Sequence, residues 1–424
     1  MEFKDITTEQ LDSAADIDAI NDDSTDQEIE DEESQISKSK LIGNHLSADY
    51  DFRYNVITKR IEFKKKADKE FVNITDRDLN SIWLSCVENK IECSKSNLKD
   101  LLNSNFTIEY DPFRDYFDEL PIDKGQIDYI KIFTDCFHLV NESERKYFEK
   151  YFGIFIRGVV GCAYDSEPNH TCLTFVGQQG KFKTTALNFL CPKSLRNKYL
   201  YSGSILGDKD SLIRLGTCFL INNDEFSTLN RTDIETFKSM LTMKEILVRL
   251  PYGHYAETLF RRASFVGSLN KLNFLSDTTG SRRFLIFEIE NIDIEKLKQI
   301  DMDNVYSQAF SEYKSGQQYY LLQEDNVVIQ MNNRRFDQYS LLEELIMMRF
   351  KVPEGDRKKI YLTATQIANE VFQNLKRKPT EADIRKIGSY LSKHGFEQKG
   401  KRINGIYSRY WILHRFRGST KYED

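Results

Sequence analysis

The sequence predicts an α/β fold built around a nucleotide-binding sheet. Three observations lead to this fold class. Short β-branched or aromatic runs alternate with helical stretches between about residues 158 and 290. A glycine-containing segment, GQQGKFKTT, stands between a strand pattern and a helix pattern. Polar side chains follow the later strands, where open α/β sheets bind their ligands.

The chain of 424 residues is 40% hydrophobic and 12% aromatic, which is enough for two or three domains with cores of their own. The stretch YDFRYNVITKRIEF alternates like a hairpin, and DRDLNSIWLSCVEN has apolar residues at helix spacing. We expect five segments: an acidic disordered tail (1–44), a mostly helical N-terminal domain (45–153), the nucleotide-binding domain (154–298), a helical linker (299–338) and a C-terminal module (339–424).

Charge is distributed unevenly along the chain. Residues 1–40 hold 14 acidic and 3 basic side chains, whereas residues 340–424 hold 18 basic and 10 acidic ones. The overall net charge of −6 therefore hides a basic folded part, for which nucleic acid is an expected partner. The acidic tail is either a solvating extension or an interaction arm.

Cysteine usage and hydropathy suggest a cytoplasmic protein. The seven cysteines are scattered, without a C-x-x-C pair, so they are expected to be reduced thiols and not a disulfide framework or a zinc site. No run of about 18 apolar residues is present, so no membrane partner is expected. The start, MEFKDITTEQ, lacks the basic and apolar regions of a secretion signal.

The segment CLTFVGQQGKFKTTALNFL gives the strongest local signal. It reads as a strand over 173–176, a phosphate-binding loop over 177–184 and a helix from Thr185. In this pattern backbone N–H groups and a helix N-terminus surround phosphate oxygens, Lys183 neutralises the β- and γ-phosphates of ATP, and Thr184 binds Mg²⁺. The alternative is an ordinary glycine-containing turn. The expected ATP-binding residues are Gly177, Gln178, Gln179, Gly180, Lys181, Phe182, Lys183, Thr184 and Thr185.

Phe182 departs from the usual pattern, because it stands where a second glycine is normal. A phenylalanine there should avoid left-handed backbone angles. We therefore expect a slightly altered loop in which Gly180 makes the sharp turn.

Three later segments add candidate catalytic side chains. In GTCFLINNDEF, Asp224 would hold Mg²⁺ and Glu225 would orient the attacking water. Asn270 follows the strand 263–268 and would contact that water or the γ-phosphate. Arg282 and Arg283 precede another strand and would reach a neighbouring subunit's γ-phosphate as an arginine finger. Each feature alone could be an acidic turn, a turn asparagine or a surface arginine pair, but their order along the chain favours one shared site.

These motifs, GQQGKFKTT, FLINNDEF, FKSMLT, PYG, RRASFVGSLN and DTTGSRRF, resemble the virulence-associated protein E family over about residues 50–300. The resemblance implies an AAA+-like ring ATPase, with a hexamer as one expected ring size, related to the superfamily 3 helicases of phages, plasmids and mobile islands. Such a protein would act on single-stranded DNA or remodel an origin. Many relatives carry a fused primase domain. None is recognised here, so a primase or replication protein would be a separate partner.

The family pattern also places pore-facing DNA contacts between the acidic strand and Asn270. The candidates in this sequence are Lys238, Lys244, Arg249, Tyr252 and His254, since cations follow phosphates and aromatic rings stack on bases. For any one of them, a solvated charge on a helix or hairpin is an equally good interpretation.

The C-terminal module has the order of a winged helix-turn-helix domain: three helices, then strands over 396–399 and 407–413. Thr380 and Asp383 form a capping pattern for the third helix, which would enter the major groove of duplex DNA. A winged helix used only for protein contacts is the alternative. The expected DNA contacts are Arg385, Lys386 and Lys393 on the helix and Lys399, Lys401 and Arg402 on the hairpin.

Together the sequence predicts a DNA-dependent ATPase, a helicase or replication initiator, that forms a homo-oligomer with ATP sites shared between subunits. Two other functions fit the same motifs: an ATP-switched DNA-binding regulator, and a phage-defence ATPase without helicase activity.

Overall fold

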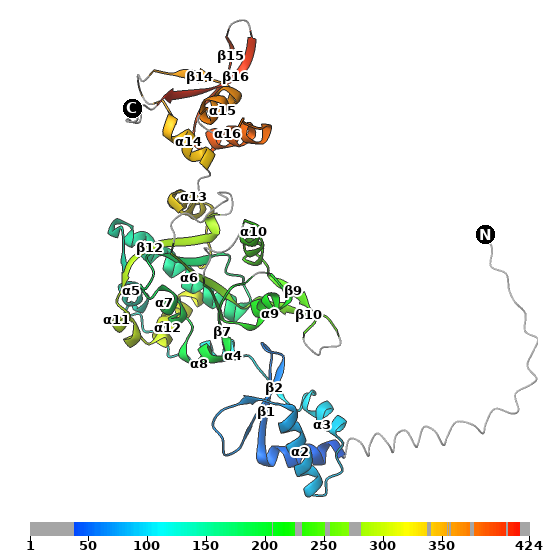
Figure 1. Ribbon diagram of the computed structural model, residues 1–424. Coiled ribbons are helices and arrows are strands. Elements are labelled where there is room, and N and C mark those ends of the chain that lie inside the picture. The colour runs from blue at the N-terminus through cyan, green and yellow to red at the C-terminus, as the bar shows by residue number, and fades with distance from the viewer. Residues whose placement is uncertain are drawn as a thin grey trace, which may run out of the picture. The chain divides into compact units, whose positions relative to one another are not determined.

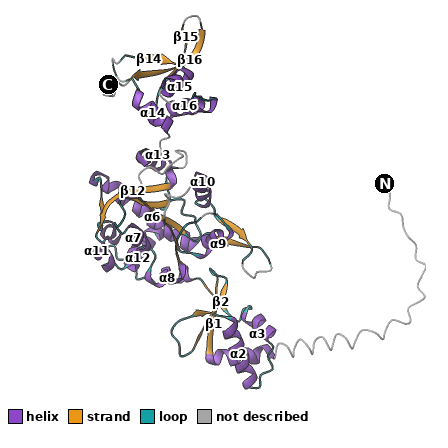
Figure 2. Ribbon diagram, viewed as in Figure 1, coloured by secondary structure: helices purple, strands orange, loops and turns teal. Residues whose placement is uncertain are grey.

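The computed structural model describes residues 38–205, 207–224, 231–250, 255–270, 281–336, 341–353, 355, 358–373, 377–403 and 406–415 (Figure 1). The chain divides into two compact units, the first ending at Pro121 and the second beginning at Ile122. Helices and strands are mixed in both units (Figure 2). In the described part of the chain, no helix is both long enough and apolar enough to cross a membrane.

The N-terminal unit is a small four-stranded sheet packed with helices. The strand order is β3-β2-β1-β4, and β1 and β2 form the hairpin that the alternating pattern predicted. The mostly helical domain expected here is therefore a mixed one, because β3 and β4 are too short to show any periodicity. Its elements are a helix over 38–49, β1 (Tyr50–Asn55), β2 (Arg60–Lys65), β3 (Val72–Asn73), α2 (Asp76–Glu88), α3 (Lys95–Leu102), β4 (Ile108–Tyr110) and α4 (Pro112–Asp118).

The acidic tail expected over 1–44 does not extend to residue 44. Residues 38–44 begin the first helix, and Ile42 and Leu46, one helical turn apart, are buried in the core of the N-terminal unit. This apolar pair belongs to the folded part because burying it stabilises the helix against α2 and α3. Residues 1–37 lie outside the described residues.

The second unit is organised by a six-stranded sheet of order β5-β12-β6-β11-β8-β7. All neighbours are parallel except β5 and β12. Strands β6 and β11 are buried along their whole length, as expected for parallel strands covered on both faces. The strands are β5 (Phe137–Leu139), β6 (Cys172–Val176), β7 (Leu200–Ser202), β8 (Leu220–Asn223), β11 (Ser264–Leu269) and β12 (Phe284–Ile292).

Helices cover both faces of this sheet (Figure 1). On one face, Phe148 of α6 packs against Phe175 and Phe287, with ring centroids 6.3 and 4.7 Å away. On the other, Phe237 of α10 packs against Phe265 at 4.9 Å. The elements around the sheet are α5 (Tyr129–Thr134), α6 (Arg145–Asp165), α7 (Lys183–Phe189), α8 (Lys193–Tyr199), α9 (Lys209–Thr217), α10 (Arg231–Met240), β9 (Glu245–Val248), β10 (Glu257–Phe260), α11 (Ile294–Gln299), α12 (Met302–Lys314) and α13 (Gln323–Asn333).

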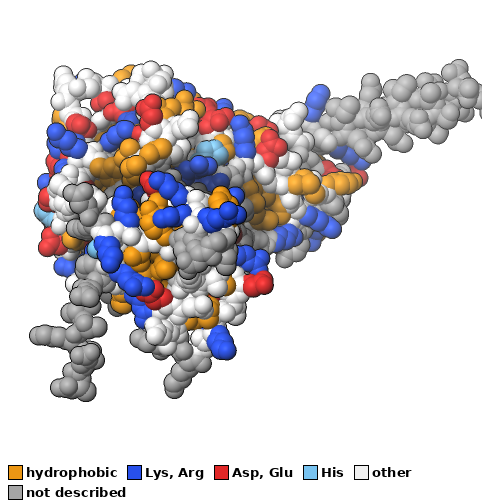
Figure 3. All heavy atoms as spheres, turned by 90° about the horizontal axis from the view of Figure 1, so that it is seen from above, with side chains coloured by type: hydrophobic (Ala, Val, Ile, Leu, Met, Phe, Trp, Pro, Cys, Tyr) orange, Lys and Arg blue, Asp and Glu red, His pale blue; other side chains and the backbone are white. Residues whose placement is uncertain are grey.

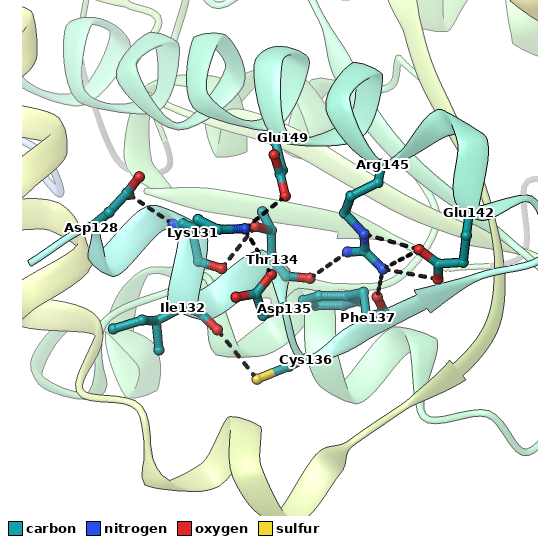
Figure 4. A network of polar contacts seen from close by, with 10 residues as sticks. All are labelled: Asp128, Lys131, Ile132, Thr134, Asp135, Cys136, Phe137, Glu142, Arg145 and Glu149. Carbon is teal, nitrogen blue, oxygen red and sulfur yellow. Dashed lines mark hydrogen bonds and ion pairs between the residues drawn. The ribbon is translucent and has the colours of Figure 1, made fainter.

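The start of α6 is fixed by a polar network that joins it to α5 and β5 (Figure 4). Arg145 donates to the carbonyl oxygens of Thr134 (3.0 Å) and Phe137 (2.6 Å), and it also pairs with Glu142. The hydrogen bond from the Leu139 amide is the main cause that lowers the pKa of Glu142. Because α6 runs unbroken from Arg145 to Asp165, the boundary expected after residue 153 falls inside this helix.

The stretch expected as a helical linker, 299–338, packs on the sheet instead. Helix α12 pairs with α6 through Arg157 and Glu312. In α13, the amide nitrogen of Asn333 donates to the carbonyl oxygens of Ser281 and Phe284, each at 2.8 Å. These buried bonds fix α13 beside the start of β12.

The C-terminal segment has a core of its own, in which Ile346, Ile387 and Trp411 are buried. Three helices and the hairpin β15–β16 occur in the predicted order, and Thr380 and Asp383 form the predicted capping box. Strands β13 and β14, which pair with β16, were not predicted because they are only two and three residues long. The elements are α14 (Leu341–Arg349), β13 (Phe350–Lys351), β14 (Ile360–Leu362), α15 (Ala364–Phe372), α16 (Glu381–Lys393), β15 (Gln398–Ile403) and β16 (Ile406–Arg415).

Candidate functional site

Polar side chains meet at the carboxyl edge of the central sheet, where the parallel strands β6, β8 and β11 end side by side. Asp224 follows β8, and Asn270 follows β11. The loop 177–182 follows β6, and the Gly177 amide donates to the carbonyl oxygen of Leu269 at 3.1 Å. This is the edge at which open α/β sheets bind ligands.

Two glycines shape the loop 177–182. A Cβ on Gly177 would lie 2.4 Å from the carbonyl oxygen of Ile289, so only glycine fits beside β12 at this position. Gly180 has a φ of +81° and makes the sharp turn, as predicted. Gln178, Gln179 and Gly180 are exposed, and Lys181 is half-buried, so the outer surface of the loop faces solvent.

Phe182 corrects the prediction for this loop. It was expected to avoid left-handed angles, yet it has φ 56° and ψ 20° at the N-cap of α7. The entry into α7 imposes this geometry whatever side chain is present. For a bulky residue such a conformation costs about 1–3 kcal/mol. The Phe182 side chain is nevertheless 53% exposed, so packing within the chain does little to offset the strain.

Lys183 is the buried cation of the site. Its ammonium donates to the carbonyl oxygens of Gly177 (2.8 Å) and Gln178 (2.7 Å) and to the amide oxygen of Asn270 (3.0 Å). Burial lowers the pKa of Lys183, and the charge of Asp224 opposes this shift. No side chain in the described ranges caps α7. The amide N–H groups of its first turn and the ammonium therefore make a region suited to an anion.

Three oxygen-bearing side chains lie next to Lys183. The Thr184 hydroxyl is 3.1 Å from an Asp224 carboxylate oxygen and 3.1 Å from the Ser268 hydroxyl. The Ser268 hydroxyl donates to the same Asp224 oxygen at 2.8 Å. A hydroxyl beside a carboxylate suits Mg²⁺, which keeps most of its ligands from phosphate and water. Within the described ranges, no group of three or more His, Cys, Asp or Glu side chains could hold a metal by itself.

Sequence reasoning missed Ser268 and Asn222. The Asn222 amide donates to the Thr184 carbonyl oxygen (3.2 Å) and to the Asn188 side-chain oxygen (2.8 Å), which ties β8 to α7. Both residues lie inside strands, and only their polarity in otherwise apolar runs could have signalled them. Thr185 is exposed on the first turn of α7, and Glu225 lies outside the described residues.

The arginine pair lies at the opposite edge of the sheet. Arg282 and Arg283 precede β12, whose register pairs Phe284 with Cys172 at the start of β6. A rise of about 3.3 Å per residue puts about 20 Å between this amino edge and the loop after β6. The arginines therefore do not join Lys183, Asp224 and Asn270 within one chain.

Two of the five DNA contacts proposed for the central domain, Lys238 and Lys244, form ion pairs within the chain. Lys238 is 2% exposed, with its ammonium 2.9 Å from Glu235, so it does not lie on the surface. Lys244 is exposed but pairs with Glu167 at 3.0 Å. Arg249 is exposed just after β9. Tyr252 and His254 lie outside the described residues.

The C-terminal candidates are all exposed. Arg385, Lys386 and Lys393 lie on the outer side of α16, away from the buried Ile387 and Leu391. On the hairpin, Lys399, Lys401 and Arg402 are exposed on β15, and the Lys401 ammonium lies 4.2 Å from the ring centre of Tyr361. Seen from the side of this hairpin, Lys and Arg side chains gather in groups among apolar ones (Figure 3).

Fold and site together define an α/β protein whose parallel sheet gathers a lysine, two hydroxyls, a carboxylate and an amide at the ends of adjacent strands. Residues 122–338 match the virulence-associated protein E-like domain, slightly more than half of the chain. The match begins where the second compact unit begins. The chain belongs to this family.

Two solved structures of the NrS-1 C-terminal region are similar to the chain at 13% sequence identity. One is an apo structure with a TM-score of 0.49, and the similarity covers 89% of this chain and 99% of that one. The other, an A form apo structure, has a TM-score of 0.48 and coverages of 90% and 99%. No curated protein matches the chain.

Proposed function

We propose that this protein is an ATP-hydrolysing motor that acts on DNA in the replication of a mobile genetic element. One observation carries the proposal. The Lys183 ammonium is held between the carbonyl oxygens of a glycine-containing loop and Asn270, with Thr184, Ser268 and Asp224 directly beside it. This is the arrangement that a phosphate-binding loop of the P-loop class uses for a nucleoside triphosphate.

Each side chain then has a defined task. Lys183 and the loop amides would bind the β- and γ-phosphates. Thr184 and Asp224 would hold Mg²⁺, which supplies charge neutralisation when bound. Asn270, which contacts Lys183 at 3.0 Å, would orient the attacking water. Asp224 already accepts hydrogen bonds from Ser268 and Thr184. We therefore assign to Glu225 the role of accepting the proton of the attacking water.

Lys183 and the pair Arg282 and Arg283 lie at opposite edges of the sheet, which supports an ATP site shared between subunits. Arg282 and Arg283 are about 20 Å from the loop of their own chain, beyond the reach of an arginine side chain. They would act as arginine fingers only on the nucleotide of a neighbouring copy, as in a ring of the AAA+ type. We therefore propose a homo-oligomer with ATP bound between subunits.

The C-terminal segment supports DNA as the partner. Its order of helices and hairpin is that of a winged helix, with α16 as the recognition helix for duplex DNA and β15–β16 as the wing. The exposed cations on α16 and β15 would contact phosphates, which favours electrostatic and salt-sensitive binding. This segment would deliver the motor to an origin.

The first test is steady-state ATP hydrolysis with and without single-stranded DNA. Lys183→Ala removes the only buried ammonium of the loop, so turnover should fall about 100-fold or more. Lys193→Ala, an exposed lysine on the neighbouring helix α8, is the matched control and should hydrolyse normally. Turnover retained in Lys183→Ala would contradict the assignment of the loop.

The hydrolysis assay with single-stranded DNA distinguishes the motor from a second candidate function. Strong stimulation by single strands supports a motor. The basic C-terminal segment also fits an ATP-switched duplex-binding regulator. Hydrolysis that ignores single strands, together with tight sequence-specific duplex binding, would favour that regulator.

A further inference from the structure

A cavity of about 500 Å³ opens at the amino edge of the central sheet. Its wall combines apolar and aromatic, cationic, acidic and neutral polar side chains, and includes Ile154, Tyr319, Tyr320, Arg282, Arg283 and Glu167. Tyr319 and Tyr320 are in edge-to-face contact with ring centroids 5.1 Å apart, and Tyr320 is 53% exposed. The cavity therefore suits an aromatic group that can contact both tyrosine rings and guanidinium groups.

An aromatic ring that has no ring contact with the described part of the chain stands at the opposite edge of the same sheet. Phe182 is exposed, has left-handed backbone angles and directly precedes Lys183. Glycine would occupy this position without strain, and an exposed ring gives the chain nothing in return. Phenylalanine at this point is therefore better explained by a contact that one copy alone does not make.

The proposed shared ATP site brings these two features together. If Arg282 and Arg283 of one copy reach the nucleotide of the next, then the cavity that they line faces the loop 177–182 of that next copy. Phe182 is one residue from Lys183, so its ring lies at the edge of the phosphate site. An oligomer that brings Arg282 and Arg283 of one copy to the ATP phosphates of the next copy therefore also brings the cavity of the first copy close to Phe182 of the next.

We propose that Phe182 of one copy inserts between Tyr319, Tyr320 and Arg282 of a neighbouring copy and fixes the alignment of the shared ATP site. The inference rests on the proposed function, because that function decides which edges meet. A second copy of this chain is the committed occupant of the cavity. Phe182 acts as a positioning residue: it sets where the partner's arginines lie.

Cross-linking between two single variants tests the contact directly. Phe182→Cys and Tyr320→Cys chains are mixed with ATP and oxidised gently, and a disulfide-linked dimer is expected. A bridge within one chain is excluded, because the two positions lie at opposite edges and a disulfide needs Cα atoms within about 7 Å. Among the seven native cysteines, only Cys93 is not buried, so background cross-linking should be low.

The control pair is Phe182→Cys with Val140→Cys. Val140 is 54% exposed, but its amide donates to the carbonyl oxygen of Glu288, which places it at the carboxyl edge. This pair should give no dimer. Equal cross-linking of both pairs, or none of the Tyr320→Cys pair, would overturn the inference.

Phe182→Gly separates positioning from loop structure. Glycine relieves the backbone strain, so ATP binding should be unchanged or tighter, while turnover at low protein concentration should fall about tenfold. Raising the protein concentration should restore turnover, because the variant weakens only the contact between copies. Phe182→Tyr, which keeps an aromatic ring, should lose less turnover at low protein concentration than Phe182→Gly does. A Phe182→Gly protein with normal turnover at every concentration would show that the ring does not align the site.

The experiments distinguish a failure of the proposed ATPase function from a failure of the proposed Phe182 contact. If the unaltered protein hydrolyses ATP through Lys183 but the cross-link and the Phe182→Gly effect are both missing, then only the inference about Phe182 is wrong. If the specific cross-link forms but no hydrolysis is seen, then the contact is right and the ATPase function is wrong.

Discussion

The chain contains two Arg-Arg pairs at the amino edge of the same sheet, and they have opposite environments. Arg261 and Arg262 precede β11, whereas Arg282 and Arg283 precede the next parallel strand along the chain, β12. Arg261 is completely buried, and Arg262 is 8% exposed. Arg282 is exposed and has no hydrogen-bond or ion-pair partner among the residues that the structure describes, while Arg283 is half-buried.

The difference comes from the backbone that surrounds each pair. The Arg261 guanidinium donates to the carbonyl oxygens of Ala263 (3.0 Å), Met240 (3.2 Å), Leu241 (2.6 Å) and Asn169 (2.7 Å). It thereby donates to two carbonyl groups at the end of α10, where helical partners run out. Among the described residues, Arg283 donates to a single carbonyl oxygen, that of Lys238, at 3.3 Å. An identical dipeptide is therefore structural in one place and available for a partner in the other.

Replacing Arg261 should give the largest effect on stability. Arg261→Met roughly keeps the length of the side chain but removes four buried hydrogen bonds to carbonyl oxygens, and a buried group left unsatisfied costs about 1–3 kcal/mol. We expect the free energy of unfolding to fall by about 3 kcal/mol or more, measured by urea denaturation followed by circular dichroism. Arg282→Met, the same change at the exposed pair, is the control and should shift it by less than about 0.5 kcal/mol. Equal shifts in both variants would remove the distinction between the pairs.

Replacing the second pair should instead affect turnover. Arginine fingers contribute about 10³–10⁵-fold to turnover, so Arg282→Ala or Arg283→Ala should lower it by at least about 100-fold without loss of ATP binding. Mixing Lys183→Ala subunits with Arg282→Ala/Arg283→Ala subunits should recover part of the activity, because some interfaces then combine an intact lysine with intact arginines. No recovery, with mixed oligomers shown to form, would mean that the site is not shared.

The two pairs also show how far the sequence could predict the site. The order of motifs located Lys183, Thr184, Asp224 and Asn270, which the structure brings together, because parallel strands that end in polar residues must present them at one edge. The burial of a side chain and the backbone angles of a single residue could not be predicted in this way. The burial of Arg261 and Lys238 depends on how α10 packs, and the left-handed angles of Phe182 depend on the turn into α7. Neither leaves a local signal.

The sequence predicts the long strands but not the short ones. The long apolar runs that form β6, β11 and β12 were recognised from residue type alone. In contrast β3, β4, β13 and β14 are only two or three residues long, so pairing with a neighbour defines them and no periodicity does. Residues 299–338 read as a linker because their pattern is charged and helical, but buried bonds such as those of Asn333 attach them to the sheet.

The smallest expected effect concerns His170, which lies between the two pairs. Partial desolvation of the ring is the main cause that lowers the pKa of His170, although the residue keeps an exposed surface. The charges of Arg261 and Arg283 lower this pKa further, whereas the Leu241 carbonyl oxygen and Glu167 oppose the shift. Its Nδ1 lies 3.3 Å from the Leu241 carbonyl oxygen, which Arg261 also contacts. The folded protein therefore resists protonation of this ring more than the unfolded chain does.

The sign of the pH dependence follows from this pKa. Below the ordinary histidine pKa of about 6.5, the unfolded chain binds a proton that the folded protein does not, so stability is lost as the pH falls through this range. His170→Gln should reduce the slope of unfolding free energy against pH between about 7 and 5.5. Arg283→Ala should raise the pKa of His170 in an NMR titration, and Arg282→Ala should leave it unchanged. If Arg282→Ala raises it as much, Arg282 is closer to the His170 imidazole than the structure places it, and the distinction between the buried arginine pair and the more accessible one would not hold.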